Sequence, residues 1–349
     1  MRIYIAAVEE KAGKTALILG LGALLGERGT VGYLKPVGWA NIYRSGKPFD
    51  RDGEVVARAL GLRRDPGELV PVLGSDYPRY WRPPRDAWEV IRAAAEGWEA
   101  DFLLVEGRQW LGRGLLSGLS DVALAAGLEA PILLVSNYEG EASVDRILRA
   151  QRTIGPEARL LGVVLNGVAA DPELPEVRGY VVPFLEERGI PVLGVLPFER
   201  RLRAVPLAEV VEALGGEVLV EGDPRAEVER FLVGAMGGEA ALGYLRRIPG
   251  KLAVVTGGDR VDIQVAALGC PRVKGLILTG GLRPEPSVLA RAAETGTIVV
   301  LVPQDTMTAA ETAEGLIGRA TVSEEALGVM RGLVAEGLDL ERLLEYAGR

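Results

Sequence analysis

Short runs of apolar residues alternate along most of the chain with longer segments in which apolar residues recur at helical spacing. The first such unit covers residues 1–26, with an apolar run at 3–8, a loop that ends at residue 15, and then leucines at helical spacing. Strands that are apolar throughout and alternate with helices are typical of a parallel sheet that is covered on both faces. The pattern therefore predicts an α/β fold that opens with strand, loop and helix.

The same alternation continues to about residue 200. We expect strands at 31–34, 102–105, 132–135, 160–165 and 192–196. We expect helices at 52–60, 87–99, 121–126, 143–154 and 181–188. The segment 74–85 contains Tyr77, Tyr80 and Trp81 together with three prolines, which predicts an irregular loop that covers a site.

A second α/β series begins at Pro249, with strands expected at 252–256, 276–278 and 298–302 and helices at 261–268, 287–294 and 308–316. We accordingly expect a larger α/β domain at 1–205, a joining segment at 206–248, a smaller α/β domain at 249–320 and C-terminal helices at 321–349. The pattern of residues 323–346 predicts two amphipathic helices that are separated at Gly337. Such helices could cover a core or contact a partner chain. We also expect the chain to form a homo-oligomer.

The loop before the first helix ends in Gly13, Lys14 and Thr15. Backbone N–H groups and the helix dipole make such a helix start a site for phosphate, while the lysine reaches the outer phosphates and the hydroxyl can bind Mg²⁺. The full pattern places glycine where this chain has Val8, and the two carboxylates after Val8 would repel a triphosphate unless they point away or meet the metal. The alternative is a surface turn; we favour a P-loop that binds ATP with magnesium.

Polar residues also follow several predicted strands, at the sheet edge where open α/β proteins bind ligands. Lys35 is either a catalytic residue that faces the substrate or a solvated lysine at a strand end. Asp52 and Glu106 could complete an all-oxygen magnesium site with Thr15. Asp50 and Asp52 could instead cap the helix that follows, and Glu106 could bind backbone amides. Asn166 could contact a base through its amide or form a turn.

Five segments occur in an order that carries a family resemblance: VEEKAGKT at 8–15, YLKPVG at 33–38, LLVEG at 103–107, GVVLNG at 162–167 and VLGVLP at 192–197. Together they resemble dethiobiotin synthetase-like P-loop ATPases, most of all the version that is fused to the front of long bacterial phosphotransacetylases. The resemblance implies a P-loop NTPase-like parallel sheet with helices on both faces. In dethiobiotin synthetase the reaction is the ATP-driven closure of a ureido ring from a carbamate.

The resemblance also implies roles for individual residues. Lys14 and Thr15, after Gly13, would bind phosphate and magnesium, and Asp52 and Glu106 would complete the metal site. Lys35 would face the phosphoryl or carboxylate substrate. Asn166 would lie near the base.

In the second half, Asp259 and Arg260, together with Thr279, Gly280 and Gly281, resemble the small domain named DRTGG. That domain accompanies the P-loop region in long phosphotransacetylases and also occurs beside nucleotide-sensing modules. These residues form our second candidate site. An alternative that needs no ligand is a helix cap made by Asp259 with the aspartate three residues later.

Composition narrows the function classes. Hydrophobic residues make up 48% of the chain and charged residues 25%, values typical of a soluble globular protein. The formal net charge is -8 and no basic stripe occurs, so we expect no nucleic-acid partner. No apolar run has the length of a membrane span and no signal-peptide pattern precedes the first strand, which predicts a cytoplasmic protein without a membrane contact. Abundant Arg, Leu, Val and Gly are compatible with a thermophile, and equally with a GC-rich genome.

The chain has a single cysteine, Cys270, and no histidine. This excludes an intrachain disulfide, a cysteine zinc cluster and any Ser-His or Cys-His nucleophile pair. A Cys-His amidotransferase site, which cobyrinate-type amidation requires, is therefore excluded. A phosphotransacetylase needs a further catalytic domain, so we do not expect a complete phosphotransacetylase.

The leading hypothesis is an ATP-binding protein that acts as a regulatory or sensor module, with a small-molecule ligand or a protein of acetate and acyl-phosphate metabolism as its partner. A magnesium-dependent ligase that activates a carboxylate or carbamate with ATP is the second hypothesis. The third is a degenerate P-loop scaffold for protein contacts.

Overall fold

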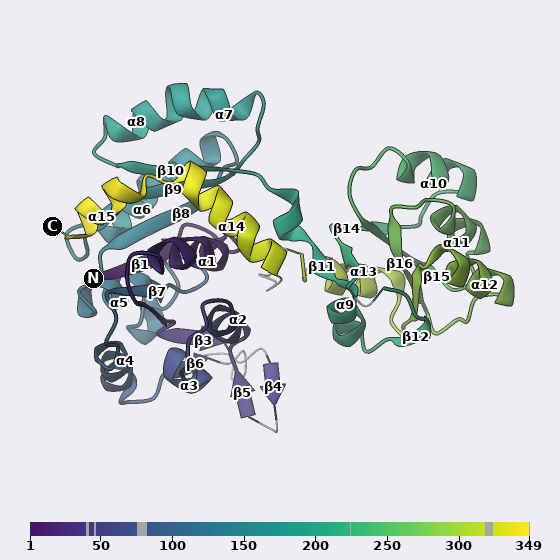
Figure 1. Ribbon diagram of the computed structural model, residues 1–349, viewed down its shortest axis with the longest axis horizontal. Helices are drawn as coiled ribbons and strands as arrows, with labels where there is room; N and C mark the ends of the chain where they lie inside the picture. The colour runs from purple at the N-terminus through teal and green to yellow at the C-terminus, as the bar shows by residue number, and fades with distance from the viewer. Residues whose placement is uncertain (40–41, 45–46, 75–81, 224, 318–323, 349) are drawn as a thin grey trace. The chain divides into compact units, whose positions relative to one another are not determined.

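The computed structural model describes residues 1–39, 42–44, 47–74, 82–223, 225–317 and 324–348 (Figure 1). The chain divides into two compact units, Met1–Glu199 with Val322–Arg349 and Arg200–Thr321. The aromatic residues of the expected covering loop, Tyr77, Tyr80 and Trp81, lie outside the described residues.

The first unit is built on a six-stranded sheet with the strand order β10-β9-β8-β1-β7-β2, and every neighbouring pair is parallel. The strands are β1 (Arg2–Ala7), β2 (Val31–Leu34), β7 (Phe102–Glu106), β8 (Ile132–Asn137), β9 (Leu160–Val168) and β10 (Val192–Pro197). Most residues of these strands are buried, as the continuous apolar runs predict. The α/β class and the parallel sheet expected from the sequence are confirmed.

Alternate residues of the strands serve opposite faces of this sheet. Tyr4 and Ala6 of β1 belong to a core with residues of the helices α4 (Ala87–Glu96), α5 (Asp121–Gly127), α6 (Glu141–Ile154) and α8 (Val182–Glu186). The helix α1 (Lys14–Leu25) contacts β1 and β7 but contributes no residue to that core. The sheet therefore carries helices on both faces.

The C-terminal helices belong to this first unit. The helix α14 (Glu324–Gly337) lies beside α1, and a Cβ atom on Gly20 of α1 would come within 2.6 Å of the carbonyl oxygen of Met330 (Figure 1). After α14, the N–H of Asp339 donates to the carbonyl oxygen of Leu193 in β10 at 2.8 Å, and α15 (Leu340–Gly348) follows. The tail thus forms two helices, the first of which ends at Gly337 and packs against α1 and β10.

Smaller elements surround the sheet edge. They are β3 (Val37–Trp39) paired with β6 (Val72–Gly74), β4 (Ile42–Arg44) paired with β5 (Lys47–Phe49), α2 (Arg51–Ala59), α3 (Pro66–Leu69) and the 3₁₀ turn η1 (Leu115–Ser117). The helix expected at 181–188 starts earlier, as α7 (Glu173–Glu176) and a π-helical turn, η2 (Val177–Val181). Asn166 lies within β9 and not after it, because that strand continues to Val168.

The second unit has a five-stranded sheet with the order β12-β17-β16-β15-β14, in which only β12 runs antiparallel to its neighbour. Its strands are β12 (Glu217–Val220), β14 (Arg230–Val233), β15 (Leu252–Gly257), β16 (Val273–Thr279) and β17 (Ile298–Leu301), with a separate pair of β11 (Val205–Pro206) and β13 (Glu227–Val228). One face packs against α10 (Gly238–Leu245), α11 (Val261–Leu268) and α12 (Pro286–Thr295). The other packs against α9 (Leu207–Leu214) and α13 (Thr306–Glu314).

The segment 206–248, which we expect from the sequence to join two domains, is part of this second unit. It supplies the strands β12 and β14 and the helices α9 and α10, so the unit begins well before Pro249. The strands β12 and β14 are only four residues each, and each begins with a charged residue, so their periodicity is too brief to distinguish a strand from a loop.

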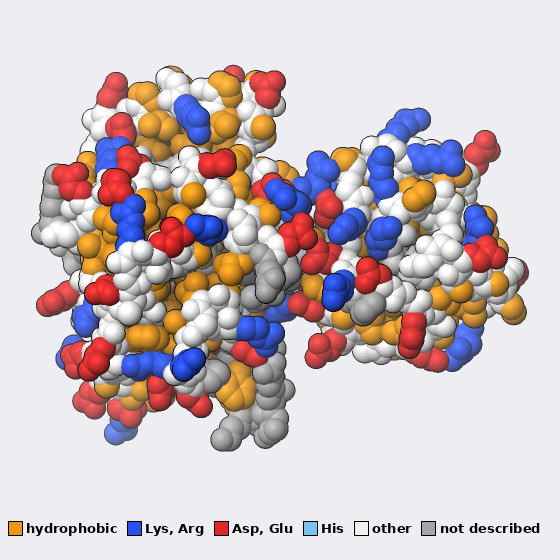
Figure 2. Space-filling model, in the orientation of Figure 1, with side chains coloured by type: hydrophobic (Ala, Val, Ile, Leu, Met, Phe, Trp, Pro, Cys, Tyr) orange, Lys and Arg blue, Asp and Glu red, His pale blue; other side chains and the backbone are white. Residues whose placement is uncertain are grey.

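Among the described residues, no helix combines the length and apolar character needed to cross a bilayer. On the face shown in Figure 2, Lys and Arg side chains are interspersed with Asp and Glu. This mixture agrees with the absence of a basic stripe in the sequence.

Candidate functional site

Two asparagines from neighbouring strands hold the loop between β1 and α1. Asn137 of β8 donates its side-chain amide to the carbonyl oxygen of Lys11 at 3.2 Å, and Asn166 of β9 donates to the carbonyl oxygen of Ala12 at 2.9 Å. In a trans peptide the N–H points opposite to the C=O. The N–H groups of Ala12 and Gly13 therefore point away from the two asparagines, as consecutive donors at the start of a helix. Such a pair is an anion-binding arrangement.

Gly13 is required by this arrangement for two reasons. Its φ angle of 95° lies in the left-handed region, and a Cβ atom there would come within 2.3 Å of the Asn166 amide nitrogen. Asn166 thus has a structural contact with the loop, whereas the sequence suggested a base contact or a turn. Asn137 was missed, although it too is a polar residue at the end of an apolar run.

Glu9, one of the two loop carboxylates, points toward α6. It accepts a hydrogen bond from the backbone N–H of Asn137 at 2.6 Å and forms an ion pair with Arg146 at 2.9 Å. Burial raises the pKa of Glu9, while these two contacts oppose the shift. Glu10 is exposed. Because the Glu9 carboxylate points toward Asn137 and Arg146, it does not face the side of the loop where a phosphate would bind.

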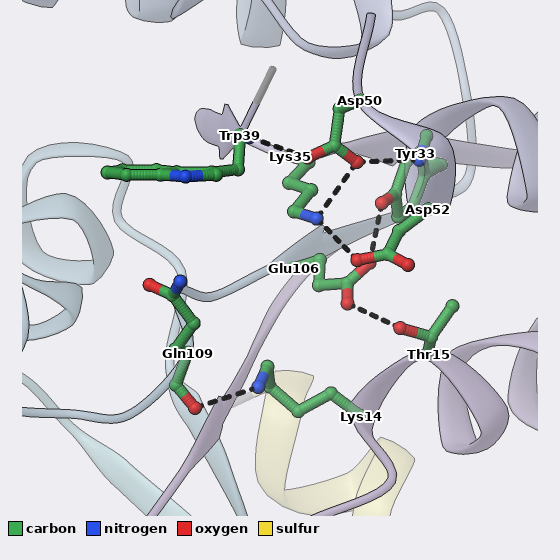
Figure 3. Close-up of polar contacts among 10 residues, drawn as sticks. Lys14, Thr15, Tyr33, Lys35, Trp39, Asp50, Asp52, Glu106 and Gln109 are labelled. Atoms are coloured by element: carbon green, nitrogen blue, oxygen red, sulfur yellow. Dashed lines mark hydrogen bonds and ion pairs between the residues drawn. The ribbon is translucent and has the colours of Figure 1, made fainter. Parts of the chain in front are cut away.

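Lys14 and Thr15 begin α1 and lie against the loop that follows β7. The Nζ atom of Lys14, which is 8% exposed, donates to the carbonyl oxygen of Gln109 at 3.3 Å (Figure 3). Burial lowers the pKa of Lys14. The hydroxyl of Thr15 donates to Glu106 at 2.7 Å, so the lone pairs of its oxygen stay available for a metal ion.

Glu106 ends β7 at the centre of the cluster. One of its oxygens accepts from Thr15, and the other accepts from the hydroxyl of Tyr33 at 2.5 Å. Burial raises the pKa of Glu106, although Lys35 and Lys14 pull it down. The carboxylate is therefore fixed in orientation by two hydroxyl donors from α1 and β2.

Lys35, after β2, is held between two aspartates. Its Nζ atom lies 2.9 Å from Asp50 and 2.7 Å from Asp52 (Figure 3). Burial acts to lower the pKa of Lys35, but the two carboxylates outweigh burial and raise it. Burial likewise acts to raise the pKa of Asp52, and the ion pair with Lys35 outweighs it and lowers the value. Lys35 is a buried, paired lysine and not the solvated lysine of the alternative interpretation.

Asp50, not Asp52, is the capping residue of α2. It accepts from the backbone N–H groups of Gly53 at 3.1 Å and Trp39 at 2.7 Å in addition to Lys35. Asp52 lies in the first turn of the helix, with one oxygen on Lys35. Asp52 is therefore the more accessible of the two carboxylates, because its side chain is 36% exposed whereas that of Asp50 is buried.

The charges of the cluster suit a divalent cation. Three carboxylates, on Asp50, Asp52 and Glu106, face two ammonium groups, on Lys14 and Lys35. Hydroxyl and carboxylate oxygens are the ligands that Mg²⁺ prefers, and it usually takes its remaining ligands from water and phosphate. Within the described part of the chain, no group of three or more His, Cys, Asp or Glu side chains is placed to hold a metal ion. Other ligands, such as the Thr15 hydroxyl, water and phosphate, would have to complete the site.

In the second unit, the two halves of the second candidate site follow adjacent parallel strands. Asp259 and Arg260 come after β15, and Thr279 ends β16 and precedes Gly280 and Gly281, which both have positive φ angles. The N–H of Gly258 donates to the carbonyl oxygen of Thr279 at 3.3 Å. The topology therefore brings all five residues to one edge of the sheet.

The expected cap at Asp259 is wrong. Arg260 occupies the N-cap position of α11 without a side-chain cap, and Asp262 instead accepts from Arg260 at 3.1 Å and from the N–H of Gly238 at 3.2 Å. The spacing of the two aspartates matched a cap, but the helix begins one residue too late for Asp259 to reach its N–H groups.

Comparisons with known proteins agree with this architecture. A family model described as an AAA domain matches residues 1–205, and one described as a DRTGG domain matches residues 209–316. A phosphate acetyltransferase from Nitrosomonas europaea is 31% identical, over 79% of this chain and 41% of that protein. A hydrogenobyrinate a,c-diamide synthase from Streptomyces coelicolor is 31% identical, over 62% of this chain and 43% of that protein.

Among solved structures, the septum site-determining protein MinD from Pyrococcus horikoshii, complexed with Mg-ADP, is 18% identical and aligns over 58% of this chain and 84% of its own with a TM-score of 0.34. The chain spans less than half the length of the two curated relatives above. The P-loop and DRTGG pair expected from the sequence motifs is confirmed.

Proposed function

The chain belongs to the AAA domain family, whose model covers residues 1–205, and we propose on this premise that its first unit binds ATP with magnesium. The observation that carries the proposal is the loop before α1. Its N–H groups at Ala12 and Gly13 point away from the two asparagines that hold its carbonyl oxygens. Lys14 and Thr15 follow immediately, which places an ammonium group and a hydroxyl beside the same anion site.

Each residue of the cluster has a role in this proposal. The loop N–H groups and Lys14 bind the phosphates, and Lys14 exchanges its contact with the Gln109 carbonyl for a phosphate oxygen. Thr15, Asp52 and Glu106 hold the magnesium ion, which neutralises phosphate charge. Tyr33 fixes the orientation of Glu106 from the opposite side.

We propose further that the protein is a regulatory or sensor module related to phosphate acetyltransferases. Two observations support such a role: an AAA domain is followed by a DRTGG domain, and a phosphate acetyltransferase matches most of this chain over less than half of its own length. The edge of the second sheet at Asp259, Arg260 and Thr279 is a candidate for a second ligand.

A magnesium-dependent ligase is the second candidate, and one observation favours it: Lys35 is buried beside Glu106 in the same cluster. A ligase would need Lys35 to give up Asp50 or Asp52 in order to bind the acceptor. The module proposal needs no such exchange.

Isothermal titration with Mg-ATP tests the proposal. We expect saturable binding by the wild-type chain and a loss of at least about tenfold in affinity for Lys14→Ala, since a charged hydrogen bond to phosphate is removed. Lys251→Ala, at an exposed lysine of the second unit, is the matched control and should bind as the wild type does. Equal binding by Lys14→Ala would overturn the site, and no binding by the wild type would leave the scaffold hypothesis.

Phosphate release then separates the module from the ligase. The module should bind ATP without releasing phosphate faster when acetate or another small carboxylate is added. Phosphate release that a small carboxylate stimulates would favour the ligase.

A further inference from the structure

Arg113 lies against two tryptophans next to the P-loop cluster. Its guanidinium carbon is 4.7 Å from the ring centre of Trp39 and 5.1 Å from that of Trp110. Both distances are those of cation–π contacts. The backbone N–H of Arg113 also donates to the carbonyl oxygen of Trp110 at 2.9 Å, which fixes the turn that brings the two side chains together.

The two tryptophans come from the loops that flank the proposed phosphate site. Trp39 ends β3, and its backbone N–H donates to Asp50, the partner of Lys35. Trp110 follows Gln109, whose carbonyl oxygen accepts from Lys14, and the next residue, Leu111, donates its N–H to Ala7 at the end of β1. In Figure 3 the Trp39 ring and the Gln109 side chain project to the same side of Lys35. Arg113 is thus connected to the cluster through Trp39, which binds Asp50, and through Trp110, which follows Gln109.

Arg113 differs from the two lysines of the cluster in the groups that surround its positive charge. Lys35 is paired with two carboxylates, and Lys14 faces the phosphate side of the loop. Across the described residues, no carboxylate lies within ion-pair distance of the Arg113 guanidinium. Two indole rings lie against the guanidinium, which presents a rigid fork of N–H donors that matches a carboxylate or phosphate.

We propose that Arg113, which contacts Trp39 and Trp110, binds the oxyanion of a small acidic ligand, either a carboxylate or a phosphate, next to the nucleotide. The inference rests on the proposed function only in that a nucleotide occupies the neighbouring loop. The tryptophans hold the guanidinium in place, so that its donors are already oriented before the ligand arrives. The site gives the module a second small molecule to sense beside ATP.

The test follows the indole N–H resonances of ¹⁵N-labelled protein while sodium acetate or inorganic phosphate is added at constant ionic strength, with Trp39→Phe and Trp110→Phe used for assignment. We expect the resonances of Trp39 and Trp110 to shift saturably with at least one anion. Saturation by acetate names a carboxylate as the ligand, and saturation by inorganic phosphate alone names a phosphoryl group. The absence of a saturable shift with both anions overturns the proposal.

Variants separate binding from packing. Arg113→Lys keeps the charge but loses the planar fork, so the anion affinity should fall about tenfold or more, because a bidentate charge-assisted pair is lost. Arg152→Met, at an exposed arginine on α6, is the control and should leave the shifts unchanged. Anion affinity in Arg113→Lys that equals the wild-type value would overturn the bidentate site. Binding of Mg-ATP should stay within about twofold in Arg113→Lys, so a failure of this inference is distinct from a failure of nucleotide binding.

Discussion

The side-chain amide of Asn166 donates a hydrogen bond to the carbonyl oxygen of Ala12 across 2.9 Å, just before α1 begins. Asn166 lies on β9, which is separated from β1 by the intervening strand β8. The conformation of the phosphate loop is therefore set by a residue far away in the sequence. This contact turns the N–H of Gly13 away from the strands, toward the side where an anion would bind.

Gly13→Ala should abolish this geometry. The new Cβ atom would lie 2.3 Å from the Asn166 amide and would impose a side chain at a φ of 95°. We expect unfolding free energy to fall by about 1–3 kcal/mol and Mg-ATP affinity to fall at least about tenfold. Urea denaturation and calorimetric titration measure the two effects.

Gly61→Ala is the control for that variant. Gly61 also has a positive φ angle, 64°, but no atom lies within 4 Å of the position of its Cβ. It should lose stability from backbone strain alone and keep its nucleotide affinity. Unchanged affinity in Gly13→Ala would contradict the proposed loop geometry.

Lys35→Met should be strongly destabilising. In the wild type, the Lys35 ammonium group lies 2.9 Å from Asp50 and 2.7 Å from Asp52. Its removal leaves both carboxylates without their shared cation. We expect a loss of about 3–5 kcal/mol in unfolding free energy, as is typical when one partner of a buried ion pair is removed. Lys251→Met serves as the exposed control in the same urea denaturation experiment. A loss no larger than that of the control would show that the pairs are not buried in solution.

Asp121 should make stability depend on pH. It is fully buried, it accepts from the hydroxyl of Tyr4 at 2.9 Å and from the N–H of Arg108 at 2.8 Å, and burial raises its pKa to about 6. Because the folded pKa lies above the unfolded one, the contribution of Asp121 to stability is full below about pH 4 and is lost as pH rises to about 6. The loss amounts to about 3 kcal/mol.

Asp121→Asn isolates this contribution. The amide oxygen can still accept from Tyr4 and Arg108, and the side chain no longer ionises. Urea denaturation of both proteins from pH 4 to pH 7 should show the difference in unfolding free energy shifting in favour of the variant as pH rises. Parallel pH profiles would mean that Asp121 ionises in the folded protein as easily as in the unfolded chain.

Gly20→Ala tests the docking of the C-terminal helix on α1. A Cβ atom there would lie 2.6 Å from both the carbonyl oxygen of Met330 and a methyl group of Val334. We expect a loss of about 1–3 kcal/mol from overpacking, although alanine is the better helix former. Gly332→Ala, in α14 with no atom within 4 Å, should be neutral or stabilising by up to about 1 kcal/mol. Equal thermal unfolding of the two variants would contradict the close packing of α1 and α14.

The sequence predicts those parts of the fold whose signals are local. The apolar run and leucine spacing around Gly13 and Lys14 identify the strand, loop and helix without any knowledge of neighbours. The sequence predicts Lys35 at the end of a strand and predicts Asp52 and Glu106 in one metal site with Thr15. In the structure an ion pair joins Lys35 to Asp52, and hydrogen bonds join Glu106 to Thr15 and Tyr33.

Contacts between distant segments could not be predicted in this way. The strand order that sets Asn137 and Asn166 against the loop depends on the whole sheet, and so does the direction of Glu9 toward Arg146. Arg113 carries no motif of its own, because its contact with Trp39, a residue distant in the sequence, depends on tertiary packing.

The most direct test of the central claim is a crystal structure of the chain grown with excess ATP and magnesium. We predict phosphate oxygens within hydrogen-bond distance of the N–H groups of Ala12 and Gly13, with a magnesium ion between Thr15 and the phosphates. Loop N–H groups turned outward, or a carboxylate of Glu9 or Glu10 in the place of the phosphate, would contradict nucleotide binding at this loop.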